Sequence, residues 1–201
     1  MIDHLVQEVE CLTESEVAKC LSLLNTVPWE PTTVFGLSGL EVNSDIRKNE
    51  RYCVDDNEQL AHIMHGGMNN ALLKYKDELE NNIHSEYGKY PLPGSYRCNS
   101  FRETIQILSY TEDEFYNWHY DKGVNDKDNS YHRTISVVLY LQNAEEGGRT
   151  IFPHKAYKPK AGTALIFPSN WCFPHRGEAV QKGRKIAAVT WYHSYYDYSQ
   201  D

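Results

Sequence analysis

The amino-acid sequence predicts a mainly β protein of the α+β class, an antiparallel sandwich or barrel with helices packed on one side. Apolar residues recur at helical spacing up to about residue 85, whereas from about residue 100 they fall in short runs separated by turn-forming residues. The length of 201 residues suits one domain with one substantial core. We therefore expect a single domain over residues 1–201, with helical support over about 1–85 and a strand-rich core over about 100–195.

Two helices are predicted in the first third of the chain. The first follows Thr13 and Glu16, which have the spacing of a capping box, and it ends before Pro28. The second carries an apolar stripe over residues 60–79, although the glycine pair 66–67 within it lowers helix propensity. Short strands and turns are expected between these two helices.

Five strands rich in β-branched and aromatic residues are predicted in the second half of the chain. They cover residues 103–110, 133–141, 149–152, 163–167 and 184–192. Turn-forming residues at 145–148 and 159–162 separate some of them, as in hairpins. A polar stretch over residues 122–131 interrupts the pattern; such loops are usually plain solvated connections, but its position directly after the metal motif described below makes it a lid candidate.

Composition and charge narrow the class of protein. Lys and Arg number 20 against 28 for Asp and Glu, so the formal net charge is −8, and nucleic acid is an unlikely partner. No apolar run reaches the ~18 residues of a membrane helix, and the first residues do not form a signal peptide. The five cysteines are widely spaced without a C-x-x-C motif, which is typical of reduced thiols. We expect a cytoplasmic protein without a membrane partner.

A metal-binding pattern begins at His119 and Asp121. Residues at positions i and i+2 of an extended chain point to the same face, so both side chains can reach one metal ion. Taken alone, the pair could equally be an exposed histidine beside an exposed aspartate. His175 follows 56 residues after His119 and would complete a set of two imidazoles and one carboxylate. This ligand set favours non-haem Fe(II) with open positions for a chelating co-substrate and O2.

Lys185 stands ten residues after His175, near the start of a predicted strand. Counting by twos places it on the same face as Ala187, Val189 and Trp191, so it points inward among small and apolar residues. A buried lysine without a partner is costly, which implies an anion inside. The alternative is a strand-end lysine that holds its ammonium group in water. The Fe(II) interpretation favours a buried lysine that pairs with an anion, because a dicarboxylate co-substrate needs one cation at its far end.

On these residues, the stretch from about 100 to 193 resembles the Fe(II)- and 2-oxoglutarate-dependent dioxygenases, and among them the prolyl 4-hydroxylase-like branch. The similar segments are Tyr110 to Asp121, Arg133 to Leu141, Glu146 to Pro153, Lys158 to Leu165 and His175 to Trp191. Two positions depart from that branch. Residues 112–114 are Glu-Asp-Glu where a glycine is usual, and Ala179 replaces a common proline.

The resemblance implies a double-stranded β-helix, or jelly roll, with N-terminal buttressing helices. It also implies roles for individual residues. His119, Asp121 and His175 would bind Fe(II), Lys185 would pair with the distal carboxylate of 2-oxoglutarate, and Tyr110 and Tyr140 would be hydrogen-bond candidates for this co-substrate. Both tyrosines could instead be ordinary core residues. No catalytic residue is expected beyond the metal ligands.

The implied reaction is hydroxylation of a C–H bond with consumption of 2-oxoglutarate and O2 and release of succinate and CO2, with ascorbate as a possible reductant. A proline-containing peptide or protein is the first expected substrate, as in a peptidyl-proline 4-hydroxylase. A free amino acid or other small molecule is the alternative; a nucleic-acid demethylase and a non-catalytic metal-binding jelly roll are less favoured. The candidates for substrate contact or for the lid are Tyr116, Trp191, Lys122, Asn125 and Asp128. The oligomeric state is not predicted.

Overall fold

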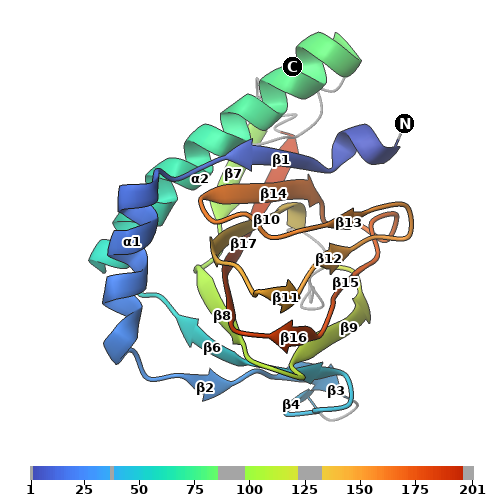
Figure 1. The fold of residues 1–201 in the computed structure, drawn as a ribbon. Coiled ribbons are helices and arrows are strands. Elements are labelled where there is room, and N and C mark those ends of the chain that lie inside the picture. Colours follow the sequence, from blue (N-terminus) through green and yellow to red (C-terminus); the bar gives the residue numbers. More distant parts are fainter. Residues whose placement is uncertain (1, 37–38, 86–97, 122–132, 197–201) are drawn as a thin grey trace.

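Two antiparallel β-sheets form the body of the fold, and two helices pack beside the larger sheet (Figure 1). The computed structural model describes residues 2–36, 39–85, 98–121 and 133–196. The stretch 122–131, with the lid candidates Lys122, Asn125 and Asp128, lies outside the described residues. The lid therefore stays a prediction.

The larger sheet contains eight strands. Its order is β1 (Gln7–Glu10), β14 (Thr163–Pro168), β10 (Arg133–Gln142), β17 (Lys185–Tyr196), β8 (Gln106–Tyr110), β6 (Glu50–Cys53) and β2 (Glu30–Pro31), while β7 (Cys98–Arg102) also pairs with β17. The five predicted strands correspond to elements of the structure, although residues 103–105 precede β8 without joining it.

The smaller sheet contains five strands. Its order is β13 (Ala156–Tyr157), β12 (Thr150–Ile151), β15 (His175–Gly177), β9 (Phe115–His119) and β5 (Arg47–Lys48), and two further ribbons pair β11 (Glu146–Gly147) with β16 (Val180–Lys182) and β3 (Val34–Gly36) with β4 (Gly39–Glu41). Along the chain, β8, β10, β14 and β17 join the larger sheet while β9, β12 and β15 join the smaller one. This alternation is the winding of a double-stranded β-helix, and the predicted fold class is confirmed.

Alternation within single strands gives the larger sheet its two different faces. In β10, Ile135, Val137 and Leu139 belong to the buried cluster that the helices share. Ser136 and Tyr140 point to the opposite face, toward the smaller sheet, where Ser136 lines a cavity. The same sheet thus supports a dry core on one side and a polar site on the other.

The helices are α1 (Glu14–Leu23) and α2 (Gln59–Glu78), and none in the described residues is long and apolar enough to span a membrane. Three further helical turns are Ile2–Leu5, Leu24–Thr26 and the π-turn Leu79–Ile83. The predicted capping box begins α1, since the Thr13 hydroxyl accepts from the Glu16 amide and the Glu16 carboxylate accepts from the Thr13 amide at 2.8 Å. The predicted stripe of α2 is buried, with Met64 and Met68 fully enclosed.

Helix α2 continues without a break through Gly66 and Gly67. A Cβ atom at position 67 would lie 2.6 Å from the Cys11 carbonyl oxygen, whereas one at position 66 would meet nothing within 4 Å. The glycine at 67 therefore permits close contact between the helix and the segment after β1. This packing offsets the lower helix propensity that the sequence indicated.

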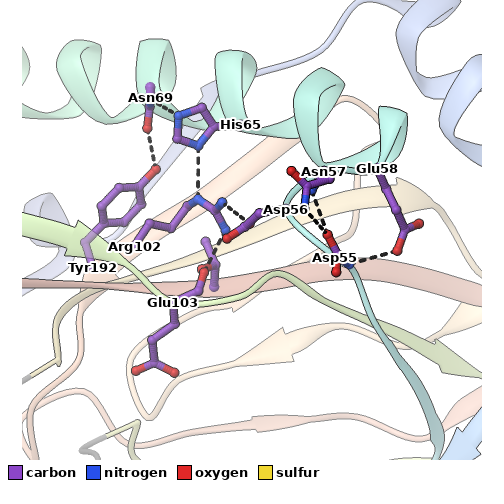
Figure 2. Close-up of polar contacts among 10 residues, drawn as sticks. Asp55, Asp56, Asn57, Glu58, His65, Asn69, Arg102, Glu103 and Tyr192 are labelled. Carbon is purple, nitrogen blue, oxygen red and sulfur yellow. Dashed lines mark hydrogen bonds and ion pairs between the residues drawn. The ribbon is translucent and has the colours of Figure 1, made fainter.

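A polar network joins the exposed side of α2 to the larger sheet, and Figure 2 shows its members. Arg102, at the end of β7, donates from Nε to His65 Nδ1 at 3.0 Å and forms an ion pair with Asp56 at 2.8 Å. The hydroxyl of Tyr192 in β17 donates to Asn69 of the helix at 2.7 Å. These bonds fix α2 against β7 and β17 where Arg102 and Tyr192 pair with each other.

Candidate active site

Three potential metal ligands meet at the edge where β9 and β15 pair. His119 is the last residue of β9 and lies directly opposite His175, the first residue of β15. Asp121 follows β9 by two residues. Its carboxylate oxygens lie 3.5 Å from His119 Nε2 and 3.9 Å from His175 Nε2, and one ligand atom from each of the three residues lies within 4.8 Å of the others.

Backbone carbonyls fix the tautomer of both histidines. His119 Nδ1 lies 2.8 Å from the carbonyl oxygen of Asn117, and His175 Nδ1 lies 3.1 Å from that of Phe173. Because a carbonyl oxygen can only accept, each Nδ1 carries a proton, and Nε2 is in each case the nitrogen that lies toward Asp121 and can bind a metal. Both imidazoles are thus oriented as metal ligands before a metal binds.

Burial favours a neutral imidazole at His175, beside an ionised Asp121. Burial lowers the pKa of His175 to about 4, against the opposing effect of Asp121. Burial alone would raise the pKa of Asp121, but His175, His119 and the Ser136 hydroxyl together hold that pKa well below its usual range. Two imidazole nitrogens and one carboxylate oxygen are the donor set of non-haem Fe(II) sites, so the residues present fit this metal.

A β-bulge in β9 brings Tyr116 to the same side as His119. The partners of His119 and Tyr116 in β15 are His175 and Gly177, so β9 has one residue more than β15 between these pairs. The Tyr116 ring stacks on the His119 imidazole, with 3.6 Å between ring centres. The Arg47 guanidinium lies 4.4 Å from the centre of the same ring. Two planar groups this close to one ring must occupy its opposite faces, so Tyr116 lies between Arg47 and His119.

Lys185 is buried in the same cavity. Its side chain is 4% exposed, so the alternative of an ammonium group held in water is wrong. Nζ lies 5.2 Å from the ring centre of Tyr110 and 5.6 Å from that of Tyr140. Among the described residues it forms no ion pair, and burial lowers its pKa to about 8. In the part of the chain that the structure describes, the cavity therefore contains a buried cation without an ion-pair partner, on which Glu178 acts only through a weaker opposing charge effect.

The two candidate tyrosines have different surroundings. Tyr110 lines the cavity next to Lys185, because the two residues are register partners on the adjacent strands β8 and β17. Tyr140 is fully buried behind the cavity wall, and its hydroxyl lies 2.8 Å from that of Thr150. Burial raises the pKa of both phenols, so both stay protonated near neutral pH. Of the hydrogen-bonded pair Tyr140 and Thr150, only Thr150 lines the cavity, and the sequence did not single it out.

One wall of the cavity is a charged cluster that sequence reasoning missed. Arg133 donates two hydrogen bonds to the carboxylate of Glu103, at 2.6 and 2.7 Å, and His193 Nε2 donates to the same carboxylate at 2.5 Å. Burial would raise the pKa of Glu103, but the hydrogen bonds from Arg133 and His193 lower it. The Arg133 guanidinium also lies 3.6 Å from the ring centre of Trp191, which was a substrate candidate.

The cavity has a volume of about 690 Å³ and opens between the two sheets. The metal ligands, Lys185 and the Arg133 cluster all line it. Apolar residues at its rim are exposed: Leu40 is 65% exposed, Tyr120 52% and Ile46 42%. The site thus combines a polar interior with an apolar rim.

Comparison with known proteins shows which proteins this arrangement is similar to. Residues 105–193 match the family model described as the 2OG-Fe(II) oxygenase superfamily. A prolyl 4-hydroxylase-like protein of Acanthamoeba polyphaga mimivirus is 32% identical over 107 residues, which cover 45% of this chain and 44% of that protein. Prolyl 4-hydroxylase 2 of Arabidopsis thaliana is 31% identical over 125 residues, covering 45% and 41%. These matches span less than half the length of either relative.

Solved structures share the fold over nearly the whole chain. A viral collagen prolyl hydroxylase from Paramecium Bursaria Chlorella virus-1, solved as a 2OG complex, superposes with a TM-score of 0.64 at 22% identity, covering 94% of this chain and 96% of that one. A prolyl hydroxylase from Trichoplax adhaerens, in complex with a peptide fragment of the hypoxia inducible factor oxygen degradation domain, gives 0.65 at 16% identity, covering 94% and 83%. At these identities the likeness concerns the fold.

Proposed function

We propose that the protein is an Fe(II)- and 2-oxoglutarate-dependent dioxygenase that hydroxylates a peptidyl proline, because residues 105–193 match the model of the 2OG-Fe(II) oxygenase superfamily and the similar curated proteins are prolyl 4-hydroxylases. The observation that carries the proposal is the occurrence, in one cavity, of a two-histidine, one-carboxylate triad and a buried lysine without an ion-pair partner in the described ranges of the chain.

The triad would hold Fe(II) through the Nε2 atoms of His119 and His175 and one oxygen of Asp121. Bound Fe(II) would leave coordination positions for a chelating 2-oxo acid and O2, whose reaction supplies the oxygen atom for the C–H bond and yields succinate and CO2. The two Nδ1–H groups, fixed on backbone carbonyls, leave Nε2 of each imidazole as the atom that would bind the metal.

Lys185 would receive the distal carboxylate of 2-oxoglutarate. An anion beside its ammonium group favours the charged form and raises its lowered pKa again, so binding of the co-substrate removes the cost of the buried charge. Tyr110 and Thr150 line the same part of the cavity and offer hydroxyl groups to the co-substrate. None of these residues needs to transfer a proton in the reaction.

The rim and the charged wall support a peptide substrate. Exposed Leu40, Ile46 and Tyr120 extend the apolar surface beyond the cavity, as suits a ligand that continues outside it. The stacked pair of Arg133 and Trp191 offers a flat wall for a prolyl ring, and the guanidinium is held in place by Glu103 and by the Asp121 carbonyl, which accepts from Nη1 at 3.2 Å. The names of the relatives supply the choice of proline. The four cysteines described are free thiols, which supports the proposed cytoplasmic location.

The proposal is tested by incubating the full chain with Fe(II), 2-oxoglutarate, ascorbate and a library of proline-containing peptides in air. We expect succinate together with a peptide product of mass +16. Separate reactions with free proline and other amino acids test the small-molecule alternative, and omitting ascorbate tests the need for a reductant. His119→Ala should abolish succinate formation, and Lys185→Ala should strongly reduce it. Absence of succinate with every peptide and amino acid would contradict the proposal.

A further inference from the structure

Two buried serines continue the metal site away from the cavity. Ser136 Oγ lies 2.7 Å from Asp121 Oδ2 and 2.8 Å from Ser169 Oγ. Both serines are 1% exposed. Ser136 lies in β10, and Ser169 directly follows β14, where its amide donates to the Thr134 carbonyl at 3.1 Å. The pairing of two strands of the larger sheet therefore sets the position of both hydroxyls.

The hydrogen-bond chain has one possible direction. An ionised carboxylate can only accept, so the single proton of Ser136 points to Asp121. Ser136 must then accept in its contact with Ser169, and the Ser169 hydroxyl is the donor. Each bond of such a chain polarises the next, so Ser169 strengthens the hydrogen bond that Ser136 makes to the carboxylate.

We propose that Ser136 and Ser169 are positioning residues of the metal centre, which occupy Asp121 Oδ2 and leave Oδ1 as the single metal ligand. A carboxylate without this restraint can rotate or bind a metal through both oxygens, which would fill a coordination position. Partners behind a metal ligand typically change metal affinity by 10–100-fold when they are removed. The proposal depends on the triad binding a divalent metal and is independent of the substrate.

This role is tested by titrating the full chain with Co(II) under anaerobic conditions, without 2-oxoglutarate or peptide, and measuring the binding by calorimetry. We expect Ser136→Ala to raise the Co(II) Kd by about tenfold or more. Ser169→Ala should raise it less, because the Ser136 proton still reaches Asp121. Ser136→Thr keeps the hydroxyl and should keep the wild-type Kd within about threefold. Ser109→Ala is the control, since Ser109 is equally buried but bonds to Arg184 rather than to a metal ligand.

Two outcomes would overturn the proposal. One is a folded Ser136→Ala variant with the wild-type Kd for Co(II). The other applies if thermal melts show that Ser136→Ala does not fold. In that case, a wild-type Kd in Ser169→Ala together with a raised Kd in Ser109→Ala would show that the effect of buried serines on Co(II) binding is unrelated to Asp121. Failure of peptide hydroxylation would contradict the proposed function but leave this result unchanged, because Co(II) binding requires no turnover.

Discussion

The guanidinium of Arg133 lies 3.6 Å from the ring centre of Trp191 and is at the same time hydrogen-bonded to both carboxylate oxygens of Glu103. Stacking fixes the plane of the guanidinium, and the bidentate contact fixes its rotation within that plane. A lysine can do neither, because its ammonium group is a point charge. This geometry leads to the first prediction.

Arg133→Lys should raise the KM for a proline peptide about tenfold, equivalent to about 1.4 kcal/mol, while the KM for 2-oxoglutarate stays near the wild-type value. Steady-state succinate assays measure both constants. Arg184→Lys is the matched control, because Arg184 lies over Trp29 and does not line the cavity. An unchanged peptide KM, or an equal rise in both constants, would show that the Arg133 wall does not recognise the peptide.

Lys185→Met should make the protein more stable at pH 7 when neither metal nor 2-oxoglutarate is present. The lysine is charged at a buried position where, among the described residues, it forms no ion pair, a cost on the order of 1–3 kcal/mol that methionine avoids. The same variant should lose 2-oxoglutarate binding. Urea unfolding measures the first effect and calorimetry the second. A variant less stable than the wild type at pH 7 would contradict this interpretation of Lys185.

The cost of Lys185 should also depend on pH. Its pKa is about 8 in the folded protein and near 10.5 when the chain is unfolded. Below pH 8 both states carry the proton, and the folded state bears the full cost. Between pH 8 and 10.5 the folded protein releases this proton while the unfolded chain keeps it, so the cost shrinks. The stability advantage of Lys185→Met should therefore be smaller at pH 9.5 than at pH 7. An advantage that grows with pH would contradict the assigned direction of the pKa shift.

The adjacent glycines of α2 should respond in opposite ways to alanine. Gly66→Ala should stabilise the protein by up to about 1 kcal/mol, because the new methyl group meets no neighbour and alanine favours the helix. Gly67→Ala should destabilise it by about 1–3 kcal/mol, because its methyl group would lie 2.6 Å from the Cys11 carbonyl oxygen. Urea midpoints measure both changes, and stabilisation by both substitutions would show that the helix can move away from Cys11.

The sequence was informative where local spacing determines structure. The capping box at Thr13, the stripe of α2 and the strand periodicity all depend on residues within one element. The triad was accessible because His119 and Asp121 are close in sequence and His175 begins a strand with a clear pattern. The inward orientation of Lys185 followed from counting by twos along one strand.

The charged wall could not be found in this way. Glu103 and Arg133 are 30 residues apart. Their contact depends on the position of β17 between β10, which carries Arg133, and β8, which follows Glu103 in the chain. His193 was within reach of the sequence, since counting by twos from Lys185 leads through Trp191 to it. Ser136 and Ser169 meet only because β10 pairs with β14. Contacts set by sheet register leave no spacing signal in one sequence.

The bulge in β9 makes the site depend on backbone conformation as well as on residue type. Tyr116 and His119 are an odd number of positions apart, yet both face the cavity, because one residue of β9 has no counterpart in β15. Residues two positions apart already share a face in a regular pleat, so deleting one residue between Tyr116 and His119 would remove the bulge and its extra twist but leave Tyr116 on the cavity side. A strand of the same length without the bulge would instead turn Tyr116 to the outer face, so a relative with the same residues at these positions builds the same substrate wall only if its strand is bulged here as well.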